Sequence, residues 1–307
     1  DLYIVTNFLY CFDSKYNVQA TVSISTLLEK YDSEVNLYIL HDNPRLFEKY
    51  KKKLLKYNNL NKIEIFKFKD TNYDFPNLKN SHVSYATYFR MFISNYLPED
   101  LDFLIYLDAD ILCLSNPRSV IEEEISKLKS SDNVLTGLNE EISSSHKQKL
   151  GIKNNRYFNA GLIIINYQKW SKLKMIDNLL NIMKSNFTNI EFWDQDILNI
   201  YFDGKFLDLP IKLNYISPDG KNLYEDEINF LHYAGSNKPW YFENTFSQIS
   251  NYYNKEYRKV FRNKYHVTFK FKKHEIPMFI DICKTKNINF SDKVRMIYSI
   301  LKTKMYF

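Results

Sequence analysis

The chain of 307 residues has little glycine and little cysteine, and it lacks long apolar runs. Its six glycines are roughly 2 % of the residues, against about 7 % in an average protein, so each is expected where a side chain cannot fit. The three cysteines, Cys11, Cys113 and Cys283, lie far apart, which argues against a disulfide framework and against a cysteine zinc site. The same cysteine usage predicts a reducing, cytoplasmic interior. Because no apolar run approaches the roughly 18 residues of a membrane span, we expect a soluble protein.

The chain also opens without a basic segment, since Asp1 leads directly into the apolar Leu2–Val5, and we expect no signal peptide. Its hydrophobic share of 45 % and charged share of 25 % are typical of globular proteins. The length predicts one large domain, alone or with an appendage. The net charge of +6 is unevenly spread, because residues 253–307 hold fourteen Lys or Arg against four Asp or Glu.

Strand and helix patterns alternate along most of the chain. The expected strands are Leu2–Thr6, Val35–Leu40, Ile63–Phe66, Phe103–Leu107, Val134–Leu138, Leu162–Asn166 and Phe206–Leu209, and the expected helices are Val18–Tyr31, Leu46–Tyr57, Tyr85–Tyr96 and Asp194–Phe202. This alternation predicts an α/β fold with a mostly parallel, doubly wound sheet flanked by helices. Glu140–Tyr157 is expected to be a polar loop. A change to aromatic and basic composition after Trp240 predicts a main domain over residues 1–246 and a helical extension over residues 247–307.

The C-terminal extension has several interpretations. It is a small helical appendage with solvated lysines, or a module that contacts anionic lipid through basic residues while aromatic rings lie at headgroup depth. Binding of nucleic acid is the least supported, because no motif for it accompanies the charge. The extension is equally compatible with docking a partner protein or a second copy of the chain in a homo-oligomer.

Two carboxylates, Asp108 and Asp110, follow Phe103–Leu107, a run typical of a strand buried on both faces. Ligands of open α/β sheets gather at the carboxyl ends of such strands. Residues i and i+2 of an extended segment share a face, so the two carboxylates repel each other unless a positive group lies between them. The usual positive group is a divalent cation that carries a phosphate substrate, so the pair of carboxylates indicates a metal site. The alternative is a strand-end turn with solvated acids.

Further polar residues offer groups for metal and phosphate. His232 offers an imidazole to a metal, Gly235 lets the backbone approach a phosphate, and Lys238 supplies a positive charge. Arg90 projects from the helix that precedes the metal strand and could clamp a phosphate. The alternatives are a structural role for the histidine and a surface salt bridge for the arginine.

Two more segments offer groups for a sugar. Asn159 lies in an Asn-Ala-Gly turn that leads into a buried strand, and its amide both donates and accepts hydrogen bonds. Asp194 and Gln195 stand at an expected helix start, where the carboxylate alternatively only caps the helix.

Together and in this order, these segments resemble glycosyltransferase family 8, the retaining galactosyl- and glucosyltransferases that include bacterial lipopolysaccharide enzymes and glycogenin. The resemblance covers the chain from about Leu2 to Trp240. The segments that carry it are Tyr85–Arg90, Leu107–Asp110, Phe158–Gly161, Asp194–Asp196 and His232–Trp240. It implies a GT-A fold and an enzyme that moves an α-linked galactose or glucose from UDP to a glycan, glycolipid or glycoprotein hydroxyl with retention of configuration.

The resemblance also implies roles for individual residues. Asp108, Asp110 and His232 would hold a manganese ion, or magnesium in its place. The implied donor-binding positions are Asp13, Tyr16, Arg90, Asp108, Ala109, Asn159, Ala160, Gly235 and Lys238. Asp194 and Gln195 match the pair beneath the transferred sugar and are the catalytic candidates. Because Gln195 is a neutral amide and a poor nucleophile, we favour front-face transfer over a covalent adduct.

The start of the chain departs from the family pattern. The family passes from its first strand almost directly into an Asp-x-x-Tyr stretch, whereas Asn7–Phe12 intervene here. Either Asp13 reads the uracil from a longer loop, or Thr6 and Asn7 read it.

A second departure is Glu140, which falls about where relatives carry a sugar-contacting aspartate. Either the contact shifts with the longer side chain, or Glu141 supplies it. The choice between glucose and galactose therefore stays open.

Two rival functions share part of the pattern. A haloacid-dehalogenase-like phosphatase also places Asp-x-Asp at a strand end, but it expects Thr or Val where Leu112 stands here. A sugar-binding module without catalysis is the other rival, and such a module would not need a full set of metal ligands.

Overall fold

The computed structural model describes residues 5–70, 72–78, 84–216, 227–269, 275–285 and 288–304. The chain divides into two compact units. The first unit is Asp1–Tyr215 with Glu225–His232, and the second is Ile216–Tyr224 with Tyr233–Phe307. The predicted domain boundary at residue 247 falls inside the second unit and stays a prediction.

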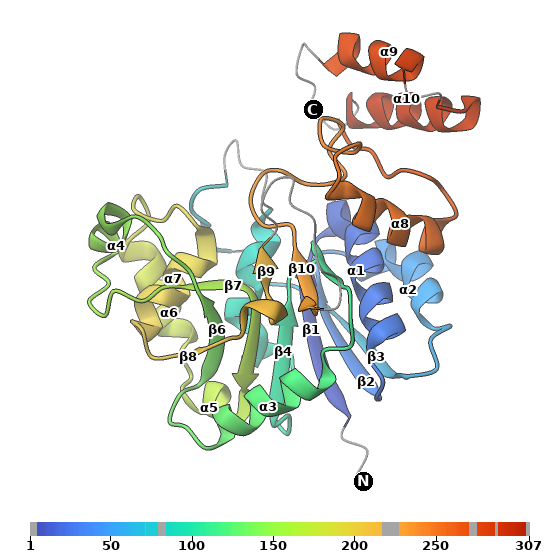
Figure 1. Ribbon diagram of the computed structural model, residues 1–307. Coiled ribbons are helices and arrows are strands. Elements are labelled where there is room, and N and C mark those ends of the chain that lie inside the picture. Colours follow the sequence, from blue (N-terminus) through green and yellow to red (C-terminus); the bar gives the residue numbers. More distant parts are fainter. Residues whose placement is uncertain are drawn as a thin grey trace. The chain divides into compact units, whose positions relative to one another are not determined.

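A seven-stranded sheet forms the centre of the first unit, in the order β3-β2-β1-β4-β7-β6-β8 (Figure 1). Its strands are β1 (Thr6–Phe12), β2 (Val35–His41), β3 (Leu60–Lys67), β4 (Phe103–Leu107), β6 (Leu135–Asn139), β7 (Phe158–Asn166) and β8 (Leu207–Asp208). β1 to β4 are parallel, whereas β7 runs antiparallel to its neighbours β4 and β6. The predicted α/β class with a mostly parallel sheet is confirmed.

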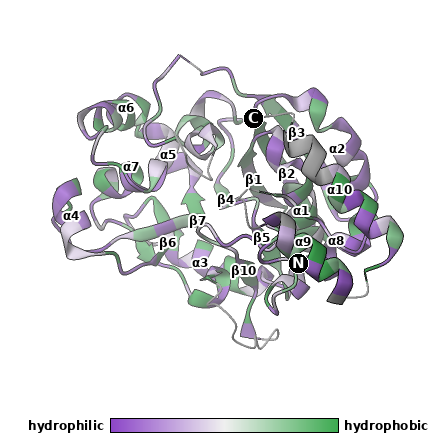
Figure 2. Cartoon of the chain, turned by 90° about the horizontal axis from the view of Figure 1, so that it is seen from above, coloured by the Kyte–Doolittle hydropathy of each residue, from purple (hydrophilic) through white to green (hydrophobic). Residues whose placement is uncertain are grey.

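Helices cover both faces of this sheet. Because alternate residues of a strand point to opposite faces, each central strand contributes to two apolar cores. Leu104 and Tyr106 belong to one apolar core, and Ile105 and Leu107 to the other. The first core is completed by η3 (Tyr85–Asn95), α5 (Tyr167–Lys172), α6 (Ile176–Ser185) and α7 (Trp193–Phe202), and the second by α1 (Asn17–Lys30), α2 (Glu48–Leu54) and α3 (Arg118–Lys129). The strands are coloured largely as hydrophobic in Figure 2, as expected for a sheet buried on both faces.

A small second sheet has the order β5-β10-β9. Its strands are β5 (Ile111–Cys113), β9 (Tyr215–Ile216) and β10 (Phe230–His232). β10 pairs antiparallel with β5, so that His232 lies opposite Ile111. The remaining short elements of the first unit are η1 (Ser14–Tyr16), η2 (Pro44–Leu46), α4 (Ser144–Leu150) and η4 (Ile211–Leu213).

The second unit contains α8 (Ser250–Phe261), α9 (Glu275–Thr285) and α10 (Phe290–Lys304). Its apolar core consists of Phe242, Val267, Phe269, Ile288 and Met296. Within the described residues of the whole chain, no helix combines the length and the apolar character that crossing a bilayer requires.

Three predicted elements differ from the structure. The first strand was expected at Leu2–Thr6, of which residues 1–4 lie outside the described residues, but the strand occupies Thr6–Phe12, where a loop was expected. Tyr85–Asn95 is a 3-10 helix, and the expected polar loop Glu140–Tyr157 contains α4. The shifted first strand matters for function, because it carries the chain directly into Asp13.

Candidate functional site

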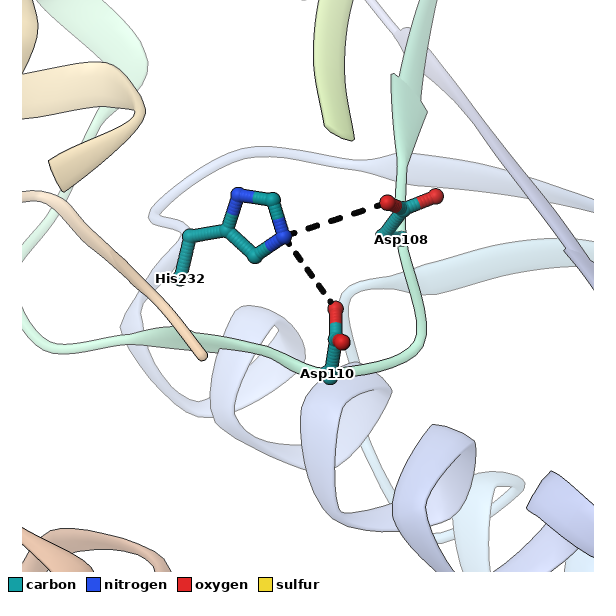
Figure 3. Close-up of side chains that lie close together, drawn as sticks. All are labelled: Asp108, Asp110 and His232. Carbon is teal, nitrogen blue, oxygen red and sulfur yellow. Dashed lines mark ion pairs between the residues drawn. The ribbon is translucent and has the colours of Figure 1, made fainter. Parts of the chain in front are cut away.

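Asp108, Asp110 and His232 converge at the carboxyl end of β4 (Figure 3). The pairing of β10 with β5 sets the imidazole beside the two carboxylates. His232 Nε2 lies 3.4 Å from Asp110 Oδ1 and 3.8 Å from Asp108 Oδ2. One ligand atom from each residue lies within 4.8 Å of the others. Two carboxylate oxygens and one imidazole nitrogen suit a divalent cation such as manganese. The structure thus brings together the three residues that the sequence predicts as metal ligands.

The electrostatics of Asp108 reflect a crowded, partly buried position. Burial raises the pKa of its carboxyl, and Arg90 opposes that rise from 3.7 Å while the neighbouring Asp110 adds to it. The Tyr106 hydroxyl donates a 2.5 Å hydrogen bond to Asp108 Oδ1. Two ionised carboxylates this close cost free energy, and a bound dication would offset that cost.

Arg90 and Asp194 form a buried ion pair beside this cluster. Arg90 is 4 % exposed and Asp194 is 1 % exposed, and the guanidinium contacts both carboxylate oxygens. Arg90 also donates to the Ala160 carbonyl and lies 4.2 Å over the Tyr106 ring. Burial raises the pKa of Asp194, while Arg90 and a 2.6 Å hydrogen bond from Thr87 lower it. Arg90 is therefore not part of a surface salt bridge, and Asp194 does not cap its helix.

The antiparallel direction of β7 brings the start of that strand to the same edge of the sheet. Asp108 N donates to Gly161 O at 2.8 Å, which fixes Asn159–Gly161 next to the carboxylates. These residues were expected to form a turn, but they are the first part of β7. Asn159 Nδ2 donates to Glu140 Oε2 at 3.2 Å, and Gln195 Nε2 approaches the same oxygen at 3.5 Å. Glu140 therefore holds the amide groups of both residues, whereas Glu141 is exposed.

Asp13 follows β1 as Asp108 follows β4, and these two strands are parallel neighbours. Asp13 is 4 % exposed, and burial raises the pKa of its carboxyl. Tyr16 ends η1, three residues further along, and packs against the α1 side of the core. Ala109, between the two metal-site aspartates, is 8 % exposed.

Thr6 and Asn7 lie at the opposite end of β1. Thr6 Oγ1 is 2.7 Å from the Tyr31 hydroxyl, and Asn7 Nδ2 donates to the carbonyl of Phe103, the first residue of β4. Asp108 follows the other end of β4, so the structure does not bring Thr6 and Asn7 to the site. Because β1 runs to Phe12, the apparent insertion before Asp13 is strand, and Asp13 is the better candidate for the base.

Gly235 and Lys238 belong to the second unit. Gly235 has a φ of 76°, a left-handed conformation that favours glycine. Lys238 is 4 % exposed, and its Nζ donates to the Tyr233 carbonyl at 2.7 Å. Their roles toward the donor stay predictions.

Sequence reasoning missed several supporting residues of the site. Tyr106 precedes Asp108 by two positions in an extended segment, so the shared face could have revealed it. Thr87, which bonds Asp194, and Asn214, which bonds His232 Nδ1 at 2.8 Å, gave no sequence signal. Both contacts join segments that lie far apart in the chain.

Comparisons with known proteins agree with this geometry. The sequence profile of the family described as Glycosyl transferase family 8 matches residues 7–244. A lipopolysaccharide 1,3-galactosyltransferase of Salmonella typhimurium is 31 % identical over 54 % of this chain and 52 % of its own length. A lipopolysaccharide 1,2-glucosyltransferase of Escherichia coli K12 is 27 % identical over 76 % of this chain and 72 % of its own. The solved galactosyltransferase LgtC superposes with a TM-score of 0.70 at 22 % identity, covering 83 % of this chain and 96 % of that one.

Proposed function

Since the chain belongs to glycosyltransferase family 8 and is a retaining hexosyltransferase of the GT-A fold, we propose that it takes galactose or glucose from a UDP-sugar. The acceptor would be a hydroxyl group of a glycan, glycolipid or glycoprotein. The observation that supports the donor class is the convergence of Asp108, Asp110 and His232 at one edge of the sheet, beside the amides of Asn159 and Gln195. The phosphatase alternative does not agree with the family match.

Asp108, Asp110 and His232 would hold the divalent cation, which we propose to be Mn²⁺ or Mg²⁺. When bound, it supplies Lewis-acid stabilisation of the negative charge that develops on the UDP leaving group. Arg90 places a second positive group 3.7 Å from Asp108, where it favours negative charge at this edge of the sheet. Lys238 would add a third positive group toward the diphosphate.

The side chains beneath the proposed sugar position favour front-face transfer. Both oxygens of Asp194 are engaged, because Arg90 contacts each of them and Thr87 donates to one. Gln195 Oε1 accepts from Ala160 N at 2.9 Å, which fixes the orientation of its amide. These contacts support an orienting role for the two side chains over a covalent one, because neither is a free nucleophile.

Release of UDP from UDP-galactose and UDP-glucose, with and without Mn²⁺, tests this function. We expect release that depends on Mn²⁺ and that falls about 100-fold or more in Asp110→Ala, because a group that stabilises transition-state charge is lost. Asp32→Ala is the matched control, since Asp32 is exposed and contacts only Arg118 among the described ion pairs. Full activity of Asp110→Ala would contradict the metal assignment. Binding of UDP-sugar without any UDP release would favour the sugar-binding module.

We also propose that α10 contacts an anionic membrane surface, from which a lipid-linked acceptor could be reached. Phe290, Val294, Ile297 and Tyr298 are 80, 46, 45 and 65 % exposed and follow the spacing of one helical face. Basic residues of the same helix complement anionic headgroups, as in other interfacial helices.

A further inference from the structure

A chain of hydrogen bonds runs from the backbone of β7 to the candidate metal ligand His232. Gly161 N donates to Asn159 Oδ1 at 2.9 Å. Asn214 Nδ2 donates to the same oxygen at 3.0 Å, and Asn214 Oδ1 lies 2.8 Å from His232 Nδ1. Asn214 has no exposed surface, and all of these residues belong to the first unit.

The donors and acceptors allow only one direction for this series of hydrogen bonds. A backbone N–H only donates, so the amide oxygen of Asn159 must face Gly161. The carboxylate of Glu140, which accepts from the other end of the Asn159 amide, requires the same orientation. Because the amide oxygen of Asn159 only accepts, Asn214 must present its NH₂ group to that oxygen and its own oxygen to His232. His232 Nδ1 must then carry the hydrogen.

The consequence appears on the other side of the imidazole ring. In the neutral ring with its hydrogen on Nδ1, the lone pair of Nε2 is free for a metal, and Nε2 is the atom that faces Asp108 and Asp110. Gly161 also limits the position of the ring, since a Cβ at residue 161 would lie 2.2 Å from His232 Cε1. The ring is therefore held at one edge by packing and at another by the acceptor of Asn214.

We propose that Asn214 is a positioning residue, which fixes His232 in the tautomer and orientation that present Nε2 to the divalent cation. The inference rests on the proposed function, because it assigns the cation to Asp108, Asp110 and His232. A neutral imidazole without a partner at Nδ1 exists in both tautomers, and only one of them has a ligand lone pair on Nε2. Loss of such an orienting partner typically lowers metal affinity about 10- to 100-fold.

Calorimetric titration of the full chain with Mn²⁺ alone tests this role. We expect Asn214→Leu to weaken Mn²⁺ binding about 10- to 100-fold, because leucine cannot accept from Nδ1. Asn214→Asp should bind Mn²⁺ more tightly than Asn214→Leu, because a carboxylate still accepts the hydrogen of Nδ1, but less tightly than the unmodified protein, because its second oxygen then faces Asn159 Oδ1. Asn229→Leu is the control, since Asn229 is also buried near β10, and within the described part of the chain its side-chain amide nitrogen bonds Ser115 and Asn116 and not His232.

Three results would overturn the proposal. They are unchanged Mn²⁺ affinity in Asn214→Leu, an equal loss in Asn229→Leu, and an Asn214→Asp variant as weak as the leucine variant. The last two would show a packing role that does not act through Nδ1.

The tautomer itself can be measured in the metal-free, unsubstituted protein, which avoids any question of folding. Long-range ¹H–¹⁵N spectra of ¹⁵N-histidine protein distinguish the two tautomers, and His232→Gln identifies the His232 signals. We expect a hydrogen on Nδ1, and a ring with its hydrogen on Nε2 alone would overturn the proposal. If the protein bound no Mn²⁺, the metal assignment would fail, while this spectrum would still decide the hydrogen bond to Asn214.

Discussion

Gly161 has an ordinary backbone conformation, yet a side chain there would collide with His232. Its ideal Cβ would lie 2.2 Å from His232 Cε1 and 3.0 Å from Asn159 Oδ1. We expect Gly161→Ala to push the imidazole away from Asp108 and Asp110 and to lower Mn²⁺ affinity at least about tenfold, as loss of ligand orientation does. Calorimetric titration with Mn²⁺ and thermal unfolding measure the two effects separately.

Gly151→Ala is the matched control for that change. Gly151 has a φ of 72° and no atom within 4 Å of its ideal Cβ. Alanine there should cost about 1 kcal/mol or more of stability, since it must adopt a left-handed conformation, and should leave Mn²⁺ affinity unchanged. If Gly161→Ala lost stability but kept its metal affinity, the contact with His232 would not matter for the site.

The residues with their own chemistry could be predicted from sequence, and the residues that support them could not. Asp108, Asp110 and His232 lie in recognisable segments, and the structure brings them together. Asn214 supports His232 from a position 18 residues away, through side-chain geometry that no local pattern records. Glu140 was expected near the sugar, but its contacts to two amides follow only from the fold.

At the scale of elements, the carboxylate of Asp196 holds the start of α7. Its Oδ1 accepts from Tyr157 at 2.6 Å and from His146 at 3.0 Å. Its Oδ2 accepts from the backbone N–H groups of Glu191 and Phe192, each at 2.8 Å. Asp196 thus joins α4, the residue before β7 and the segment before α7, and α7 is the helix that carries the catalytic candidates.

We expect Asp196→Ala to destabilise the protein by about 3 kcal/mol or more, because several buried donors lose their acceptor. Transfer should fall as well, since the Tyr157 hydroxyl that Asp196 holds lies 3.2 Å from Gln195 Nε2. Mn²⁺ affinity should change little. Urea unfolding, UDP release and Mn²⁺ titration measure these effects.

Asp177→Ala is the control, because Asp177 is an exposed acidic residue in the first turn of α6. It should cost no more than about 1 kcal/mol. Loss of metal affinity in Asp196→Ala that equalled the loss of transfer would contradict a role confined to α7.

Most elements of the sheet could be predicted, because apolar β-branched runs bounded by polar residues identify buried strands. β4 was predicted with the bounds that it has. The direction of β7 was not predicted, since a buried antiparallel strand among parallel ones has the same continuous apolar pattern. The position of β1 was missed because Leu2–Val5 is itself an apolar run, and the polar Thr6 and Asn7 separate it from the apolar residues that form the strand.

At the scale of the whole molecule, charge is concentrated in the C-terminal region, and α10 adds exposed apolar residues to it. Removal of that region is a poor test of membrane binding, because Phe242 packs against Val267 and Phe269 in the core of the second unit. Substitution of exposed side chains in the full chain avoids this loss. Phe290 and Tyr298 are suitable, since they are 80 and 65 % exposed.

We expect the double variant Phe290→Ser, Tyr298→Ser to bind vesicles of phosphatidylcholine and phosphatidylglycerol about tenfold or more weakly than the unmodified chain, because two apolar anchors are removed. Flotation at low and at high salt measures it, and high salt should weaken the remaining binding by screening the basic residues. The control is Leu46→Ser, Leu55→Ser in the first unit, two leucines that are 51 and 57 % exposed beside the lysines of α2. Equal flotation of both double variants would contradict docking through α10, because general surface hydrophobicity would then explain the binding. No flotation of the unmodified chain would remove the membrane proposal and leave the transferase site unaffected.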